Sequence, residues 1–363
     1  MSERILMSPP PSNKNSIGIF LRRVADELER RGHKVTGRLY HYAGFSMLPW
    51  QKAFVFGVPR WTTRTIASGK PVVLTIGRPE IKEENEALGF PYLPVHVEQE
   101  ATMTEAIVHA SQVVFISHYV RNVWREIFSR KGLAFPEART SVIHHGIDLD
   151  FFTPRPEQGA EPFVIGLAGE FRRIQGLVAL FEISRRLQSP HRLMFVGSMT
   201  PAYRQVFDEG MKDPGLAART TFIPWVPAKE LPRYYRQMSC FYHPIIGDSF
   251  GNVVAEALAC GVPVVCPKFG GSAEFVVPDG GIAVDSPGWD CGEVFIAGME
   301  KAISHIHANL EKFSLGARKQ AEKLVSIEAC ADDYLRLMAL PGMAALDKGH
   351  STDHPPACNQ STK

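Results

Sequence analysis

The sequence contains few cysteines and no long apolar segment. Its six cysteines form no C-x-x-C pair, so neither a disulfide framework nor a redox or zinc-binding motif is indicated. No apolar run reaches the roughly 18 residues that a membrane-spanning helix needs, and the run over residues 5–7 is too short for a signal peptide. We therefore expect a cytoplasmic protein, and peripheral contact with the inner face of the membrane remains an open alternative.

A strong charge of one sign is also absent. The formal charge is +2, from 40 Lys and Arg against 38 Asp and Glu, so nucleic acid is not an expected partner. Residues 1–155 carry 20 basic and 15 acidic side chains, a balance of +5, which leaves −3 for the rest of the chain. This distribution fits an anionic acceptor or a membrane surface beside the first half, or an ordinary solvated surface.

What the sequence does contain is a repeated alternation of amphipathic helices and apolar runs of strand length. Residues 17–31 place apolar side chains at helical spacing, and residues 53–58, 71–76 and 112–117 are short apolar runs. Prolines and a glycine over 152–162 indicate a linker, after which the alternation restarts. Two such blocks predict an α/β protein with two doubly wound domains that face one another across a cleft.

These patterns set the expected boundaries. We assign residues 1–153 to the first domain and 160–341 to the second, and we expect a disordered tail over 342–363. Residues 318–338 are expected to be helical and to cross back to the first domain. The acidic run over 80–86 is interpreted as a solvated face.

The most informative stretch is residues 243–285. A glycine-rich loop over 247–251 follows a predicted strand and leads into a helix over 252–259. The backbone N–H groups of such a loop and helix N-terminus form a site for anions and hydroxyls. Asp248 and Glu256 are separated by seven residues, and the loop can turn both carboxylates toward one cleft, where they would accept hydrogen bonds from sugar hydroxyls.

Residues 248–265 read D-S-F-G-N-V-V-A-E-A-L-A-C-G-V-P-V-V. This run resembles the signature of the retaining GT-B-fold glycosyltransferases of family 4, the glycosyl transferases group 1. Residues 142–148 (V-I-H-H-G-I-D), 193–198 (L-M-F-V-G-S) and 222–227 (F-I-P-W-V-P) resemble further segments of the same family in the same order. Asp248 replaces the family's commoner glutamate.

The resemblance implies a fold of two facing Rossmann-like domains, of which the first binds the acceptor and the second the nucleotide sugar. It implies a retaining, metal-independent transferase that needs no cofactor and that moves a sugar from a nucleoside diphosphate to a glycan, lipid-linked or small-molecule acceptor. Glu256 would bind the ribose hydroxyls and Asp248 the donor sugar. The residues that the resemblance assigns to the donor are Gly169, Trp225, Asp248, Ser249, Phe250, Gly251, Asn252, Val253 and Glu256.

One departure from the family lies where it places an arginine and a lysine on the departing diphosphate. Residues 169–176 keep the family's glycine spacing but carry Glu170 and Gln175 at those two positions. The diphosphate still requires positive charge, so we expect Arg173 or Arg172 to supply it. Arg173 is favoured because it is nearer to the position of the missing lysine.

A second departure concerns the histidine that many relatives carry in the first domain near the reacting sugar. Here Thr75 and Ile76 are followed by glycine and Arg78. His96 is the first candidate to replace that histidine and His118 the second, and a structural role is the alternative for both. Arg78 and Lys268 are further candidates for the cation that faces the diphosphate.

Other functions remain open from the sequence. Asp148 and Asp150 form a D-x-D pair, but the pair lies in the segment before the linker, and no metal is expected. A GT-B nucleotide-sugar epimerase or phosphorylase is one rival function. A degenerate transferase that acts as a non-catalytic binding partner is another, because Glu170 and Gln175 depart from the family.

Overall fold

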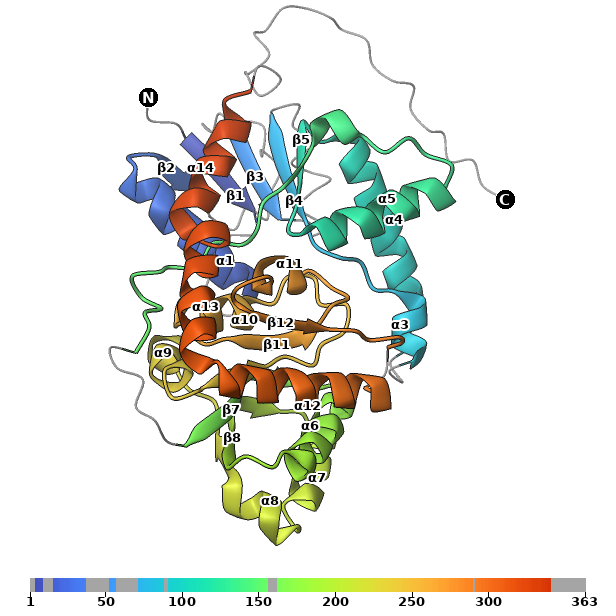
Figure 1. The fold of residues 1–363 in the computed structure, drawn as a ribbon. Helices are drawn as coiled ribbons and strands as arrows, with labels where there is room; N and C mark the ends of the chain where they lie inside the picture. Colours follow the sequence, from blue (N-terminus) through green and yellow to red (C-terminus); the bar gives the residue numbers. More distant parts are fainter. Residues whose placement is uncertain are drawn as a thin grey trace, which may run out of the picture.

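The computed structural model describes residues 4–8, 16–36, 52–56, 71–87, 91–155, 162–289 and 291–340. These residues form two six-stranded sheets, with strand orders β2-β1-β3-β4-β5-β6 and β12-β11-β10-β7-β8-β9 (Figure 1). Neighbouring strands are parallel in both sheets. The predicted fold class, two facing doubly wound α/β domains, is confirmed.

The first sheet is assembled from short, buried strands. They are β1 (Arg4–Ser8), β2 (Lys34–Thr36), β3 (Lys52–Phe56), β4 (Val72–Ile76), β5 (Gln112–Phe115) and β6 (Thr140–Val142). Its helices are α1 (Ser16–Arg30), α3 (Lys82–Ala87), α4 (Pro94–His109) and α5 (His118–Arg130). Helix α1 buries Phe20, Leu21, Val24 and Leu28, which are the apolar positions whose spacing predicts the helix.

The second sheet begins after the linker, and residues 156–161 of that linker lie outside the described part of the chain. Its strands are β7 (Phe163–Phe171), β8 (His191–Met199), β9 (Thr220–Ile223), β10 (Cys240–Tyr242), β11 (Val264–Pro267) and β12 (Gly281–Val284). Its helices are α6 (Ile174–Arg186), α7 (Pro201–Gly210), α8 (Pro214–Arg219), α9 (Leu231–Tyr235), α10 (Asn252–Ala259), α11 (Ala273–Val276), α12 (Glu293–Ala308) and α13 (Leu310–Leu324).

The closing helical region differs from the single stretch predicted over 318–338. The chain breaks at Val325 and Ser326, and α14 (Ile327–Met338) starts anew. The break is held by Ile147, which accepts from Ile327 N over 3.0 Å and donates to Val325 O over 2.7 Å. Ser326 then caps α14 by accepting from Ala329 N over 3.0 Å. Periodicity alone did not show this pairing with a segment far away in the sequence.

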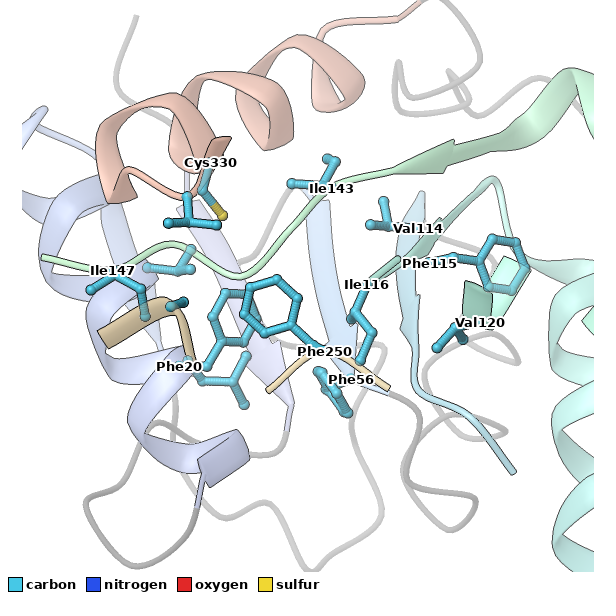
Figure 2. Packing of buried hydrophobic residues seen from close by; sticks show 14 of the residues in the cluster. Phe20, Phe56, Val114, Phe115, Ile116, Val120, Ile143, Ile147, Phe250 and Cys330 are labelled. Carbon is cyan, nitrogen blue, oxygen red and sulfur yellow. The ribbon is translucent and has the colours of Figure 1, made fainter. Parts of the chain in front are cut away.

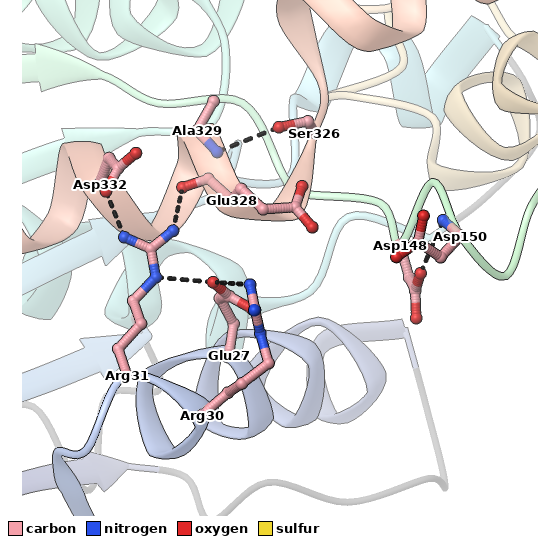
Figure 3. A network of polar contacts seen from close by, with 9 residues as sticks. All are labelled: Glu27, Arg30, Arg31, Asp148, Asp150, Ser326, Glu328, Ala329 and Asp332. Carbon is pink, nitrogen blue, oxygen red and sulfur yellow. Dashed lines mark hydrogen bonds and ion pairs between the residues drawn. The ribbon is translucent and has the colours of Figure 1, made fainter.

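Helix α14 lies beside α1 of the first domain (Figure 1). Arg31 at the end of α1 forms an ion pair with Asp332 and donates to Glu328 O over 3.0 Å, and it also reaches Glu27 (Figure 3). Thr75 Oγ1 and Tyr334 Oη lie 3.0 Å apart. The end of the described chain is thereby anchored on the first domain. The tail expected over 342–363 lies outside the described residues.

A buried apolar cluster continues from one domain into the other (Figure 2). Phe250, in the loop before α10, packs near Phe20 of α1 and Phe56 of β3. Between them the ring of His145 stacks on Phe20, with ring centroids 3.9 Å apart, and lies 4.9 Å from the ring of Phe250. The glycine-rich loop of the second domain is therefore in direct contact with the core of the first.

Candidate active site

The carboxyl ends of both sheets open into one cleft between the domains. Gly77 and Ile116 follow strands β4 and β5 of the first sheet, while Gly169 and His243 lie at the ends of β7 and β10 of the second. The cleft has a volume of about 570 Å³, which is a size typical of ligand pockets. In doubly wound folds ligands bind at this edge of the sheet, so the cleft is the candidate site.

The glycine-rich loop and the start of α10 form one wall of the cleft. The residues that line this wall are Asp248, Ser249, Phe250, Gly251, Asn252 and Val253. Gly251 precedes α10 with a φ of 86°, and a Cβ at this position would lie 2.7 Å from Ser272 Oγ, so glycine is required. The first N–H groups of α10 have no partners within the helix, so the helix N-terminus places partial positive charge at this wall of the cleft.

Asp248 is held in the cleft as a carboxylate. Its Oδ2 accepts from His243 Nε2 over 2.9 Å and from Ser272 Oγ over 3.4 Å. Burial acts to raise the pKa of Asp248, but the hydrogen bond and charge of His243 outweigh it, and the pKa lies below its usual value. His243 and Ser272 are residues that sequence reasoning did not assign to the site. Asp248 Oδ1 accepts a long hydrogen bond from Phe250 N over 3.5 Å and retains a second lone pair for a hydroxyl group.

Glu256 occupies a different environment from Asp248. It is buried, and it is not among the described residues that line the cleft. Its Oε1 accepts from Arg23 of α1 over 2.8 Å, and its Oε2 accepts from the Tyr235 hydroxyl over 3.0 Å. Burial, followed by the charge of Glu256, raises the pKa of Tyr235 well above its usual value, so the phenol stays a donor.

The two arginines after β7 point to different partners. Arg172 donates to Glu170 over 2.6 Å, and both side chains are more than half exposed. Arg173 turns inward, where it donates to Ile246 O over 2.9 Å and to Glu84 Oε1 over 2.6 Å. Arg173 therefore reaches the loop that leads to Asp248. Arg172 instead pairs with Glu170, the glutamate that stands where the family has an arginine.

Glu84 joins Arg173 to the first domain. Its second oxygen pairs with Arg78, which lines the cleft. The Glu84 side chain is 2% exposed, whereas its neighbour Glu86 is 62% exposed. The interpretation of residues 80–86 as a solvated face is therefore wrong at Glu84, which is buried because two arginines from different domains converge on it.

Comparisons with known proteins show which sequences and folds this chain resembles. Residues 162–304 match the family model of glycosyl transferases group 1. The D-inositol 3-phosphate glycosyltransferases of Paenarthrobacter aurescens and Mycolicibacterium smegmatis are 28% and 30% identical over 294 and 219 residues. The chain is thus similar in sequence to this family within its second domain, and its two-domain fold is of the GT-B type. The two alignments cover 75% and 56% of this chain and 67% and 48% of the relatives.

Solved structures share the fold of this chain along most of its length. Sucrose-phosphate synthase from Thermosynechococcus elongatus superimposes with a TM-score of 0.70 and 18% identity, covering 93% of this chain and 98% of that chain. Anabaena HepE in complex with UDP gives a TM-score of 0.70 and 16% identity, covering 93% and 100%. No helix in the part of the chain that the structure describes is long and apolar enough to cross a membrane.

The remaining predicted site residues are dispersed. His96 lies in the first turn of α4 and lines the cleft, with its Nδ1 accepting from Leu93 N over 3.2 Å. His118 begins α5, and its N–H donates to Glu274 over 2.8 Å. Trp225 is 73% exposed and is not among the described residues of the cleft wall. Lys268 is an exposed partner of Asp285.

Asp148 and Asp150 do not converge on a common point. Asp150 N instead donates to Asp148 Oδ1 over 3.0 Å, in a turn (Figure 3). Among the described residues, no group of three or more His, Cys, Asp or Glu side chains is placed to hold a metal ion.

Several contacts across the cleft were not foreseen from the sequence. Ser117 Oγ donates to Ser249 O over 2.7 Å, and Glu274 of α11 accepts from the N–H groups of His118 and Tyr119. His145 Nδ1 lies 3.1 Å from Asn252 Oδ1. Burial lowers the pKa of His145 to about 4, so its ring is neutral at neutral pH. These residues fix the loop of the second domain against the first.

Proposed function

We propose that this protein transfers a sugar from a nucleoside diphosphate sugar to a hydroxyl-bearing acceptor, with retention of configuration and without a metal ion. The observation that carries the proposal is the interdomain cleft, into which the ionised Asp248 and the N-terminus of α10 open together. A carboxylate recognises sugar hydroxyls, and a helix N-terminus recognises phosphate. Few ligands other than a sugar nucleotide present both groups.

Relatives support the choice of donor. The fold neighbour from Anabaena has been determined in complexes with UDP and with UDP-glucose. We assign Asp248 to the donor sugar and Glu256 to the ribose hydroxyls. Each carboxylate oxygen of Glu256 has one protein partner in the structure and retains a second lone pair that accepts a further hydrogen bond.

The departing diphosphate requires compensation of its negative charge, because an unpaired charge in a shielded site costs several kcal/mol. We assign this task to Arg173, with Arg78, and to the N–H groups at the start of α10. The two guanidinium groups converge on Glu84 from opposite domains. Positive charge held in place before the reaction lowers the barrier to departure of the diphosphate.

The proposed reaction breaks the bond between the anomeric carbon and the diphosphate oxygen, and the electron pair leaves with the diphosphate. The acceptor oxygen forms the new bond on the face from which the diphosphate departs. The hydroxyl proton of the acceptor passes to the released phosphate. Charge development on the leaving group is therefore the step that the arginines stabilise.

The acceptor is assigned to the first domain. Polar side chains of α4, from His96, Gln99 and Glu100, line the cleft opposite the glycine-rich loop. Such a wall suits a polyhydroxylated acceptor, which supplies both donors and acceptors of hydrogen bonds. Relatives are named for inositol 3-phosphate and for a phosphatidylinositol monomannoside. We therefore propose a polyhydroxylated acceptor of the inositol phosphate kind, which is either a free small molecule or part of a glycan or of a lipid head group at the membrane surface.

Product analysis with UDP-, GDP- and ADP-sugars in the presence of EDTA tests the proposal. Inositol phosphate, a glycan mixture and phosphatidylinositol-containing vesicles serve as acceptors. Transfer from one donor class in EDTA, with the anomeric configuration kept, is the expected result. Transfer that is lost in EDTA and restored by manganese contradicts metal independence. Nucleotide-sugar binding without transfer or hydrolysis favours the non-catalytic alternative suggested by Glu170 and Gln175.

A further inference from the structure

A second cavity lies at the opposite edge of the second sheet. It has a volume of about 350 Å³ and is lined by the amino ends of the strands, including Val164 of β7, Met194 of β8 and Thr221 of β9, and by Ser239, which precedes β10. The interdomain cleft uses the carboxyl ends of the same strands. In a parallel sheet these two edges are separated by the length of the strands, so the second cavity is distinct from the transfer site.

Three arginines line this cavity, and we call it the arginine cavity. Arg155 comes from the linker, Arg192 from the start of β8, and Arg236 directly follows α9. Among the described residues that line the cavity there is no Asp or Glu. Three positive charges thus line one small space in which no described residue contributes a carboxylate.

The three guanidinium groups form only one hydrogen bond to the described part of the chain. Arg236 donates to Thr153 Oγ1 over 3.2 Å, which engages one of its five N–H groups. The side chains of Arg155 and Arg192 have no hydrogen bond or ion pair to any described residue. Elsewhere in the same domain most arginines form pairs with carboxylates, as Arg186 does with Glu293.

An ordinary structural role accounts poorly for this arrangement. Helices of an α/β layer end at the edge where the next strand begins, and arginines there often donate to the last carbonyl groups. Arg155 and Arg192 donate to no such carbonyl among the described residues. Like charges in a shared cavity repel one another, so an anion inside it would relieve the repulsion and would find up to three guanidinium forks that match phosphate geometry.

We propose that the arginine cavity is a binding site for a small phosphorylated compound about the size of a sugar monophosphate. The guanidinium groups would hold the phosphate. Gln237 and Ser239 offer polar contacts for hydroxyls, and Met194 and Met238 provide an apolar surface for a carbon ring. The cavity volume is at the small end of the range for ligand pockets, which suits a sugar monophosphate better than a complete nucleotide sugar.

Calorimetric titration of the full chain with glucose 6-phosphate and with inorganic phosphate, at physiological salt, tests the proposal. The double variant Arg155→Ala/Arg192→Ala removes two exposed side chains and should fold normally. It is expected to bind glucose 6-phosphate at least about tenfold more weakly than the wild type. Arg173→Ala, which alters the interdomain cleft, should bind it as the wild type does, and glucose should not bind.

Three results overturn the proposal. The first is that the wild type binds neither phosphate. The second is that the double variant and Arg173→Ala both bind glucose 6-phosphate as the wild type does. The third is that only Arg173→Ala binds it more weakly, which would place the phosphate in the interdomain cleft. None of these results depends on whether the protein transfers a sugar, so the arginine cavity and the proposed activity are tested separately. If glucose 6-phosphate and inorganic phosphate bind equally, the site recognises phosphate alone and the proposed fit to a sugar is wrong.

Discussion

Arg23 donates to Glu256 over 2.8 Å, and this ion pair joins α1 of the first domain to α10 of the second. Both side chains are largely buried. Glu256 also accepts from Tyr235, so its carboxylate is fixed before any nucleotide arrives. The residue that we assign to the ribose is therefore also part of the contact between the domains.

Glu256→Gln should weaken nucleoside diphosphate binding by roughly ten- to a hundredfold, because removal of a charged acceptor costs about 1.5–3 kcal/mol. Calorimetry on the folded variant measures this. Arg23→Met is the matched control, since it breaks the same ion pair but keeps the carboxylate. It should lower stability and leave nucleotide affinity within a few fold of the wild type. Equal losses of affinity in the two variants would show that Glu256 acts through the domain contact.

Arg173→Ala should lower turnover by about a hundredfold or more, which corresponds to about 2.7 kcal/mol of transition-state stabilisation. The reason is that Arg173 reaches the loop before Asp248, whereas Arg172 faces solvent beside Glu170. Arg172→Ala is therefore the control and should change turnover by no more than a few fold. Steady-state kinetics of the two variants decide between them. Full activity in both would mean that the charge on the diphosphate is balanced elsewhere.

Glu84→Gln should destabilise the protein by about 2 kcal/mol or more, because Arg78 and Arg173 would lose the buried carboxylate that they share. Glu86→Gln, on the same helix, removes only an exposed contact with Lys82 and should change stability by no more than about 0.5 kcal/mol. Thermal or urea unfolding of the two variants provides the comparison. Similar unfolding free energies would exclude a stabilising role for the interdomain arginine pair.

Stability should fall as the pH falls from 7.5 to 5, and His145 should be one cause. The pKa of this buried histidine is lowered from 6.5 to about 4, so the unfolded chain takes up a proton in this window and the folded chain does not. The free energy of unfolding should then drop by about 2 kcal/mol from this group. The carboxyls of Asp248 and Glu274, whose pKa values are lowered, contribute at lower pH.

The comparison of His145→Asn with the wild type isolates this contribution, because the wild type should lose more stability between pH 7.5 and 5 than the variant. His109→Gln alters an exposed histidine at the end of α4 and serves as the control. Urea unfolding at both pH values gives the required free energies. Parallel pH profiles for the wild type and His145→Asn would show that His145 is not kept neutral by burial.

The fold class could be predicted from the sequence because it depends on local patterns of apolar residues. Strand-length apolar runs and amphipathic helices alternate in two blocks, and the two sheets appear where those blocks lie. The glycine-rich loop was also visible, since Asp248 through Asn252 are consecutive and their geometry depends on neighbours such as Gly251. The functional division between the two domains stays a prediction, as do the roles assigned to Asp248 and Glu256.

The contacts between the domains could not be read from the sequence. Glu84 looks like one acid in a solvated run, and only the tertiary fold brings Arg173 to it from 89 positions away. Arg23 and Glu256 are 233 positions apart. Pairing of Ile147 with the segment at Ser326 likewise interrupts a helical pattern that shows no break. Such pairings are set by packing of distant elements, and no local periodicity encodes them.

The most direct test of the central claim, that Asp248 holds the sugar of a nucleotide donor, compares two quantities in Asp248→Asn. These are the affinity for the free nucleoside diphosphate and the turnover of the corresponding sugar nucleotide. Our account predicts that turnover falls far more than affinity, because Asp248 contacts the sugar and the remaining residues hold the nucleotide. Equal losses in both quantities, or a wild-type protein that binds no nucleoside diphosphate, would contradict it.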